Sequence, residues 1–168
     1  SLNKGNTGTL VVCAESGKKD SLATYTGPVV NHGGVIEFDS IANGGSPSAL
    51  GQSLSFADNW VFDGCTYRYT GANASTDRDA LLRSSSALEL QNNYLTMNGI
   101  FEGEGDFTLQ GNGTLDVPNG SFFGYTGATI LRGGTLKLSD ANASTGSAMN
   151  FHPTQLVMAG GALFIASS

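Results

Sequence analysis

Two aspartates follow short apolar stretches in a way that suggests acid–base chemistry. Asp39 is followed by Ser40 and Ile41, and Asp63 is followed by Gly64. Aspartic peptidases pair two Asp residues on hydrophobic-Asp-Thr/Ser-Gly turns, so that one carboxyl is protonated while the other is ionised. Neither turn is complete here. The pattern therefore leaves a hydrolase with Asp39 and Asp63 as catalytic residues as an alternative function, acting on a glycoprotein such as mucin.

A second group of carboxylates can provide oxygen ligands for a metal. Glu102, Glu104 and Asp106 alternate with glycines, so in an extended strand all three face the same side. Such a set can bind Ca²⁺. The spacing departs from the EF-hand loop, and we favour exposed acidic residues at a glycine-rich corner. No cofactor is indicated elsewhere in the chain.

The chain has two cysteines, Cys13 and Cys65. Two residues exclude a disulfide-dense scaffold and a cysteine-rich zinc site. They can form one disulfide in an oxidising compartment, or they can remain as two buried thiols. Sequence spacing alone does not decide between these alternatives.

The composition limits the class of protein. The chain has 168 residues, which suits one domain, and 24 of them are glycine. Only 8 basic residues stand against 14 acidic ones, and the net charge is −6. Nucleic-acid binding needs clustered Lys and Arg, so nucleic acid is a poor partner. No apolar run reaches the ~18 residues of a membrane span.

The elements that carry these residues are predicted to be short β-strands. Apolar residues alternate with polar ones in short runs broken by Gly, Asn, Asp and Ser. The close spacing of the runs favours an all-β solenoid of about twenty residues per turn. One short helix is expected over 77–83, after a cap-like Thr76. The predicted strands are Leu10–Val12, Val35–Phe38, Leu54–Phe56, Leu88–Leu90, Leu95–Met97, Phe107–Leu109, Leu115–Val117, Leu136–Leu138, Leu156–Met158 and Leu163–Ile165.

The sequence also contains an internal repeat. Tyr25-Thr26-Gly27 recurs 100 residues later as Tyr125-Thr126-Gly127, and the glycine pair before Val35 recurs before Thr135. We therefore expect a single β-helix domain over 1–168 with two diverged copies, at about 8–64 and 103–165. Neither copy is large enough to close a core alone, so stacking must bury their apolar faces.

The motifs of the second copy resemble a known family. The segment from Gly103 to Leu115, followed by Tyr125 to Leu138, is similar to the autotransporter-associated β-strand repeat of bacterial surface proteins. The resemblance implies a single-stranded right-handed parallel β-helix that is secreted or displayed at the cell surface, associated with the outer membrane. Its motifs are mostly glycine and apolar positions, which report fold better than activity.

The resemblance favours an adhesin or binding module for a host glycoprotein or a matrix glycan. Polar side chains along the strands would then make many weak contacts, without catalysis. The aspartic-type hydrolase remains the first alternative. A structural spacer within a larger surface protein is the second.

Overall fold

The structure is a computed structural model that describes residues 1–13, 23–118, 123–139 and 155–166. In these residues the strands form three parallel sheets, and the single helical element is the short 3-10 helix η2 (Ala57–Asn59). The six-stranded sheet contains β1 (Leu2–Lys4), β3 (Val29–Asn31), β5 (Trp60–Phe62), β8 (Ala80–Leu82), β11 (Phe101–Gly103) and β14 (Phe123–Tyr125). The seven-stranded sheet contains β2 (Thr9–Val12), β4 (Gly34–Phe38), β6 (Cys65–Tyr69), β9 (Ser86–Leu90), β12 (Phe107–Gly111), β15 (Thr129–Leu131) and β17 (Leu156–Met158). The five-stranded sheet contains β7 (Ala74–Thr76), β10 (Tyr94–Met97), β13 (Thr114–Val117), β16 (Thr135–Ser139) and β18 (Ala162–Ala166).

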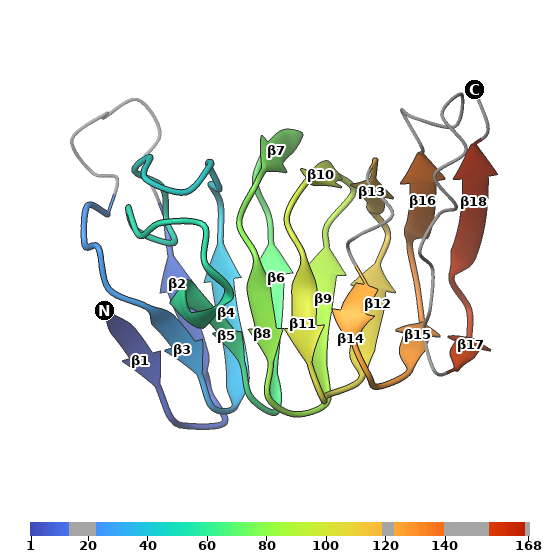
Figure 1. Ribbon diagram of the computed structural model, residues 1–168, viewed down its shortest axis with the longest axis horizontal. Helices are drawn as coiled ribbons and strands as arrows, with labels where there is room; N and C mark the ends of the chain where they lie inside the picture. Colours follow the sequence, from blue (N-terminus) through green and yellow to red (C-terminus); the bar gives the residue numbers. More distant parts are fainter. Residues whose placement is uncertain (14–22, 119–122, 140–154, 167–168) are drawn as a thin grey trace.

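From β5 to β16 successive strands visit the three sheets in turn, whereas β1 to β4 alternate between the six- and seven-stranded sheets; neighbouring strands in each sheet come from successive passes of the chain (Figure 1). Phe107 pairs with Ser86 on one side and with Thr129 on the other, so a central pass takes about 21 or 22 residues. This topology is consistent with the predicted parallel β-helix. The handedness of the coil stays a prediction.

The core lies between the three sheets and is filled with side chains. In β6 and β9 every second residue is buried, as the period-two pattern predicts. Aromatic rings stack along the core: Trp60 lies 5.2 Å from Phe62 and 5.9 Å from Phe101, measured between ring centroids. Because side chains occupy the interior, ligands must meet this protein on its outer faces.

Nine of the ten predicted strands are confirmed, and Leu54–Phe56 is wrong. This segment lies in the loop between β4 and β5, where Leu54 and Phe56 are 58% and 66% exposed. An alternating pattern needs a partner strand and a face to bury. No strand pairs with this segment among the described residues, so its alternation does not produce a strand.

The predicted helix over 77–83 is also wrong, because Ala80–Leu82 forms β8 between β5 and β11. Asp79 does not cap a helix; its Oδ1 accepts a hydrogen bond from the backbone N–H of Ile100, at 2.7 Å. Pairing with a strand on each side satisfies the backbone hydrogen bonds of this segment better than two isolated helical turns, which are marginally stable in water.

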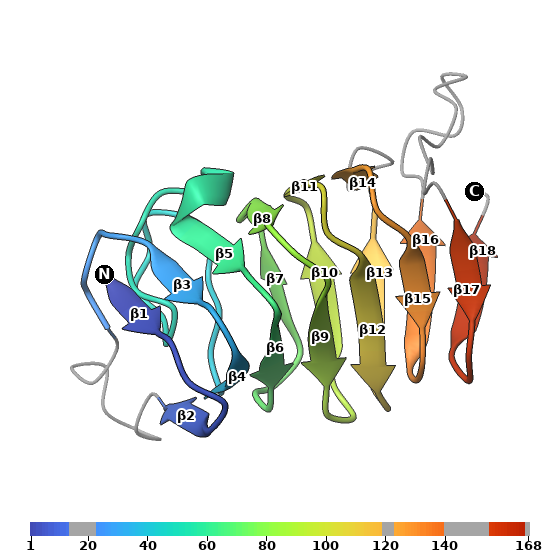
Figure 2. The ribbon, with the colours of Figure 1, turned by 90° about the horizontal axis from the view of Figure 1, so that it is seen from below.

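Arg78 holds the β4–β5 loop on the solenoid. Its guanidinium donates hydrogen bonds to the carbonyl oxygens of Ala42 and Gly51 and to Ser53 Oγ, at 2.9–3.0 Å. The loop continues into η2, which contacts β5 and β8 (Figure 2). Val61 is in the middle of β5, on the outward-facing row of its sheet, yet it is only 1% exposed. We infer that η2 and its loop cover the outer side of β5.

The two suggested repeat copies fall on different sheets. β4, in the first copy, belongs to the seven-stranded sheet, whereas β16, its counterpart in the second copy, belongs to the five-stranded sheet. The division into two copies stays a prediction. No helix in the described part of the chain is long and apolar enough to cross a membrane.

Candidate functional site

The two aspartates of the predicted catalytic pair do not meet. β4 and β6 pair in parallel from Gly34 opposite Cys65 to Phe38 opposite Tyr69. Asp39 follows the carboxyl end of this pair, and Asp63 precedes its amino end. At about 3.3 Å per residue, the paired segment alone keeps them more than about 13 Å apart. They therefore do not form the dyad that an aspartic-type hydrolase requires.

Asp63 instead forms side-chain hydrogen bonds that connect three successive passes of the chain. Its Oδ2 lies 2.8 Å from His32 Nδ1, and its Oδ1 accepts a hydrogen bond from Ser84 Oγ at 2.8 Å. Two hydrogen bonds lower the pKa of the Asp63 carboxyl. The one with His32 has the larger effect, and the one from Ser84 has the smaller effect. Ser84 donates to the carboxylate and not to the imidazole, so this arrangement lacks the serine–base contact of nucleophilic catalysis.

The three acidic residues of the calcium candidate do not form a site. Among the described residues there is no group of three or more His, Cys, Asp or Glu side chains that could hold a metal ion. Both carboxylate oxygens of Asp106 are used within the fold, since they accept hydrogen bonds from Ala128 N and Ser85 Oγ. Glu102 and Glu104 are exposed. Asp106 therefore has a structural role, whereas Glu102 and Glu104 lie on the surface.

The two cysteines are free thiols, so of the two alternatives that the sequence left open the structure shows the one without a disulfide, although only Cys65 is buried. Cys13 is exposed after β2, whereas Cys65 is buried in β6, and β4 lies between these two strands. Two strand spacings amount to about 10 Å, which exceeds the Cα separation of about 7 Å that a disulfide permits. Burial raises the pKa of the Cys65 thiol to about 11, so that residue remains protonated at neutral pH.

The outer face of the seven-stranded sheet carries a row of charged side chains that pair with one another. Arg68 Nη1 lies 3.1 Å from Glu37 Oε2, and Arg68 Nε lies 3.0 Å from Glu89 Oε1. Gln110 Nε2 donates to the other oxygen of Glu89 at 3.2 Å. These contacts link β4, β6, β9 and β12. One arginine stands against two glutamates, so the row keeps a formal charge of −1, but each of its charged side chains already has a close partner.

A second polar cluster lies on the five-stranded sheet. Tyr94 Oη donates a hydrogen bond to Asp116 Oδ2, and Lys137 Nζ lies 2.9 Å from Tyr94 Oη and 3.2 Å from Asp116 Oδ2. Burial raises the pKa of Tyr94, and the hydrogen bonds that Lys137 donates to Tyr94 and Asp116 raise the pKa of Lys137. Both groups keep their protons at neutral pH, so neither is an activated nucleophile.

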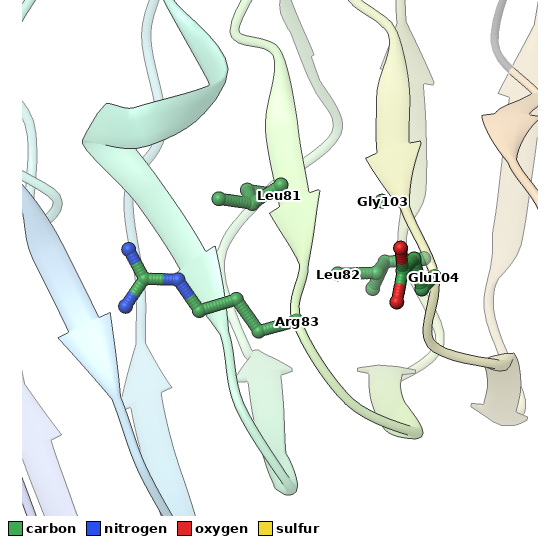
Figure 3. Close-up of a pocket in the computed structure, with 5 residues that line it drawn as sticks. All are labelled: Leu81, Leu82, Arg83, Gly103 and Glu104. Atoms are coloured by element: carbon green, nitrogen blue, oxygen red, sulfur yellow. The ribbon is translucent and has the colours of Figure 1, made fainter.

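A hollow lies on the outer face of the six-stranded sheet, between β8 and β11 (Figure 3). Its volume is about 320 Å³, at the lower end of the range for ligand pockets. Leu81 gives it an apolar side, and Arg83 and Glu104 give it opposite charges; Leu82 also lines it, but its side chain is buried in the core. In Figure 3 the Arg83 side chain extends toward β5 and away from Glu104.

Asp58, Glu102 and Arg132 are exposed and unpaired in the described structure, and so are Arg83 and Glu104 beside the hollow. Within the described residues, neither the Arg83 nor the Glu104 side chain makes a hydrogen bond or a salt bridge. Leu81 and Glu102 are register neighbours on the outward-facing row beside them. We call the surface formed by Leu81, Arg83, Glu102 and Glu104 the β8–β11 face.

Sequence reasoning missed Leu81 and Arg83 because it placed them in a solvated helix. The available signal was the apolar run Ala80–Leu82, whose three residues are too few to show a period. Glu104 was identified, but as a ligand for calcium. Trp60, Tyr67 and Tyr69 are all buried, so they provide no exposed aromatic platform.

The chain is similar to a small part of a much longer protein, the adhesin BmaC autotransporter of Brucella suis biovar 1 (strain 1330). The two are 33% identical over 151 residues, which cover 83% of this chain and 4% of the length of the relative. No family model and no solved structure matches the chain. The similarity supports a relation to autotransporter passengers, while the particular repeat family is not confirmed.

Proposed function

We propose that this chain is a surface-displayed segment of an autotransporter-type passenger, and that it acts as an adhesin-like binding module for an extracellular glycoprotein or matrix glycan. The relation to an autotransporter adhesin supports the location at the surface or outer membrane. The observation that carries the binding role is the β8–β11 face, where Arg83 and Glu104 flank an apolar hollow without pairing to other described side chains.

The other polar clusters suit a structural role better than a binding role. Arg68 is shared between two glutamates, and Lys137 is held by Asp116 and Tyr94. Polar groups that already satisfy one another would lose those contacts on binding a ligand. The side chains of the β8–β11 face form no such contacts with one another, so a ligand that binds there breaks none of them.

A binding assay with purified protein tests this proposal. The folded chain is immobilised on a biosensor and exposed to a panel of extracellular glycoproteins, each before and after enzymatic removal of its glycans. We expect at least one glycoprotein to bind, and Leu81→Ser to weaken that binding. Ile130→Ser is the matched control, because Ile130 has the same mid-strand, half-buried position on the seven-stranded sheet.

The outcomes separate the proposed function from its alternatives. Equal loss of binding in the two serine variants would show that the β8–β11 face is not the site. Absence of binding to every glycoprotein and glycan would favour the structural spacer. Cleavage of the glycoprotein that is abolished by Asp39→Asn or Asp63→Asn would instead require a hydrolase.

A further inference from the structure

An exposed apolar edge lies at the start of β8, beside η2 and next to the β8–β11 face. The backbone N–H of Asp79 donates to the carbonyl of Ser55 at 2.7 Å, which places Phe56 next to the start of β8. The N–H of Ala80 donates to the carbonyl of Ile100 at 2.8 Å, which places Ile100 on the other side. Phe56 is 66% exposed and Ile100 is 36% exposed. Apolar side chains therefore lie at the η2 end of the face as well as in the hollow.

Negative charge predominates around these apolar groups. Asp58 is exposed within η2, Asp79 lies at the start of β8, and Glu102 and Glu104 lie on and after β11. Arg83 is the single basic residue among them. Arg78 is nearby in sequence, but it is 1% exposed and its guanidinium donates its hydrogen bonds to the β4–β5 loop. A partner that matches this surface must carry positive charge next to apolar groups.

We propose that the β8–β11 face and its η2 edge bind an extended polypeptide segment of a partner protein that carries lysine or arginine on either side of an apolar residue. The apolar side chain would fill the hollow against Leu81, and the basic side chains would lie beside Glu102 and Asp58. This inference rests on the proposed binding function and deepens it, because recognition is through the polypeptide of a glycoprotein and not through its sugar.

The composition of the hollow favours a peptide over a sugar. Sugar rings are recognised largely by stacking on exposed aromatic faces, and no aromatic ring lines the hollow; Phe56, the exposed ring of this surface, lies outside it at the η2 edge. An apolar side chain of the partner can pack against Leu81, and burying it there gives affinity that does not depend on charge.

The probe for this site is a fluorescein-labelled synthetic peptide of alternating lysine and leucine, measured by fluorescence anisotropy against the whole folded chain. The comparison peptide has glutamate in place of every lysine. We expect the basic peptide to bind and the acidic one not to bind. Added salt should weaken the binding without abolishing it, because the apolar contact is not screened.

Two variants locate the binding site. Glu102→Gln should weaken the basic peptide about threefold, and Leu81→Ser should weaken it about tenfold. The control is Asn112→Lys, which changes the net charge by the same amount as Glu102→Gln. Asn112 is exposed after β12, and its side chain makes no hydrogen bond to the described residues, so the control should leave binding at this face unchanged.

Three results would overturn the inference. These are equal binding of the acidic peptide, equal weakening by Glu102→Gln and Asn112→Lys, or no effect of Leu81→Ser. Binding of glycoprotein that disappears on removal of its glycans, together with no binding of the basic peptide, would overturn this inference alone and leave the proposed function intact. Absence of binding to peptide, glycoprotein and glycan would overturn both.

Discussion

Arg78 Nη2 donates a hydrogen bond to the carbonyl oxygen of Gly51 at 2.9 Å, although 27 residues separate them in the chain. Backbone carbonyls and a serine hydroxyl take the place that a carboxylate usually occupies beside a buried arginine. Burial lowers the pKa of this guanidinium, but arginine is protonated in proteins at any physiological pH. The β4–β5 loop is therefore held in place by one buried cation.

Loss of this cation should destabilise the fold. Arg78→Met should lower the free energy of unfolding by about 3 kcal/mol, because several loop carbonyls lose their buried donor. Arg78→Lys should recover only part of the loss, since an ammonium cannot reproduce the planar fork of donors. Urea denaturation measures both effects. Arg83→Met, at an exposed position in the same segment, should change the free energy by less than about 0.5 kcal/mol; equal effects of Arg78→Met and Arg83→Met would contradict the assigned role.

The two thiols should differ in reactivity. Cys13 is exposed, whereas burial in β6 raises the pKa of Cys65 to about 11. We expect a thiol reagent such as iodoacetamide to label one cysteine in the folded protein and both in denaturant. Cys13→Ser should remove the labelling of the folded state, and Cys65→Ser should not. Mass spectrometry of the unreduced protein should show two free thiols, and an intramolecular disulfide would refute the register between β2, β4 and β6.

The hydrogen bonds of Asp63 should make the stability of the fold depend on pH. Its carboxyl has a pKa below that of the unfolded chain, which is about 3.9. A group of this kind contributes stability above the unfolded pKa, and the contribution is lost as the pH falls through the folded pKa. Asp63→Asn should therefore be less stable than the parent protein near neutral pH, and the difference should shrink below about pH 4. A difference that stays constant from neutral pH down to about pH 2 would mean that the carboxylate is not the source.

A glycine at a corner of the coil should be irreplaceable. Gly111 has φ +92°, and a Cβ built there would lie 2.2 Å from the carbonyl oxygen of Leu90 in the preceding pass. Gly111→Ala should thus lower the free energy of unfolding by about 3 kcal/mol. Gly5→Ala is the control, because no atom lies within 4 Å of its added Cβ. Similar melting temperatures of the two variants would show that the passes are not packed this closely.

The strands that alternate over four or five residues could be predicted from the sequence. Val35–Phe38, Leu88–Leu90 and Leu136–Leu138 all lie in strands, because alternating side chains on a sheet face the core and the solvent in turn. The resemblance to surface-protein repeats also agrees with a coil of parallel sheets and with the adhesin relative.

The same reasoning did not predict the strands of the six-stranded sheet. Each of its strands is three residues long, as in β8 and β11. Three residues define no period, and their strand conformation depends on partners from the preceding and following passes. Part of the β4–β5 loop was mistaken for a strand for a related reason. Leu54 and Phe56 alternate like a strand, but the burial of Arg78 against carbonyls far along the chain holds the segment outside the sheets.

Sequence alone therefore determined that this chain forms short strands with alternating apolar residues and that acidic residues outnumber basic ones, 14 to 8. Tertiary structure decided which polar residues meet, separating Asp39 from Asp63 and joining Asp63 to His32 and Ser84. The physical reason is that each outward side chain has its neighbours on the adjacent passes, which lie 21 residues away in the central passes and 31 residues away between β4 and β6. A shift of a single residue in a corner would exchange those neighbours, and no local pattern records that register.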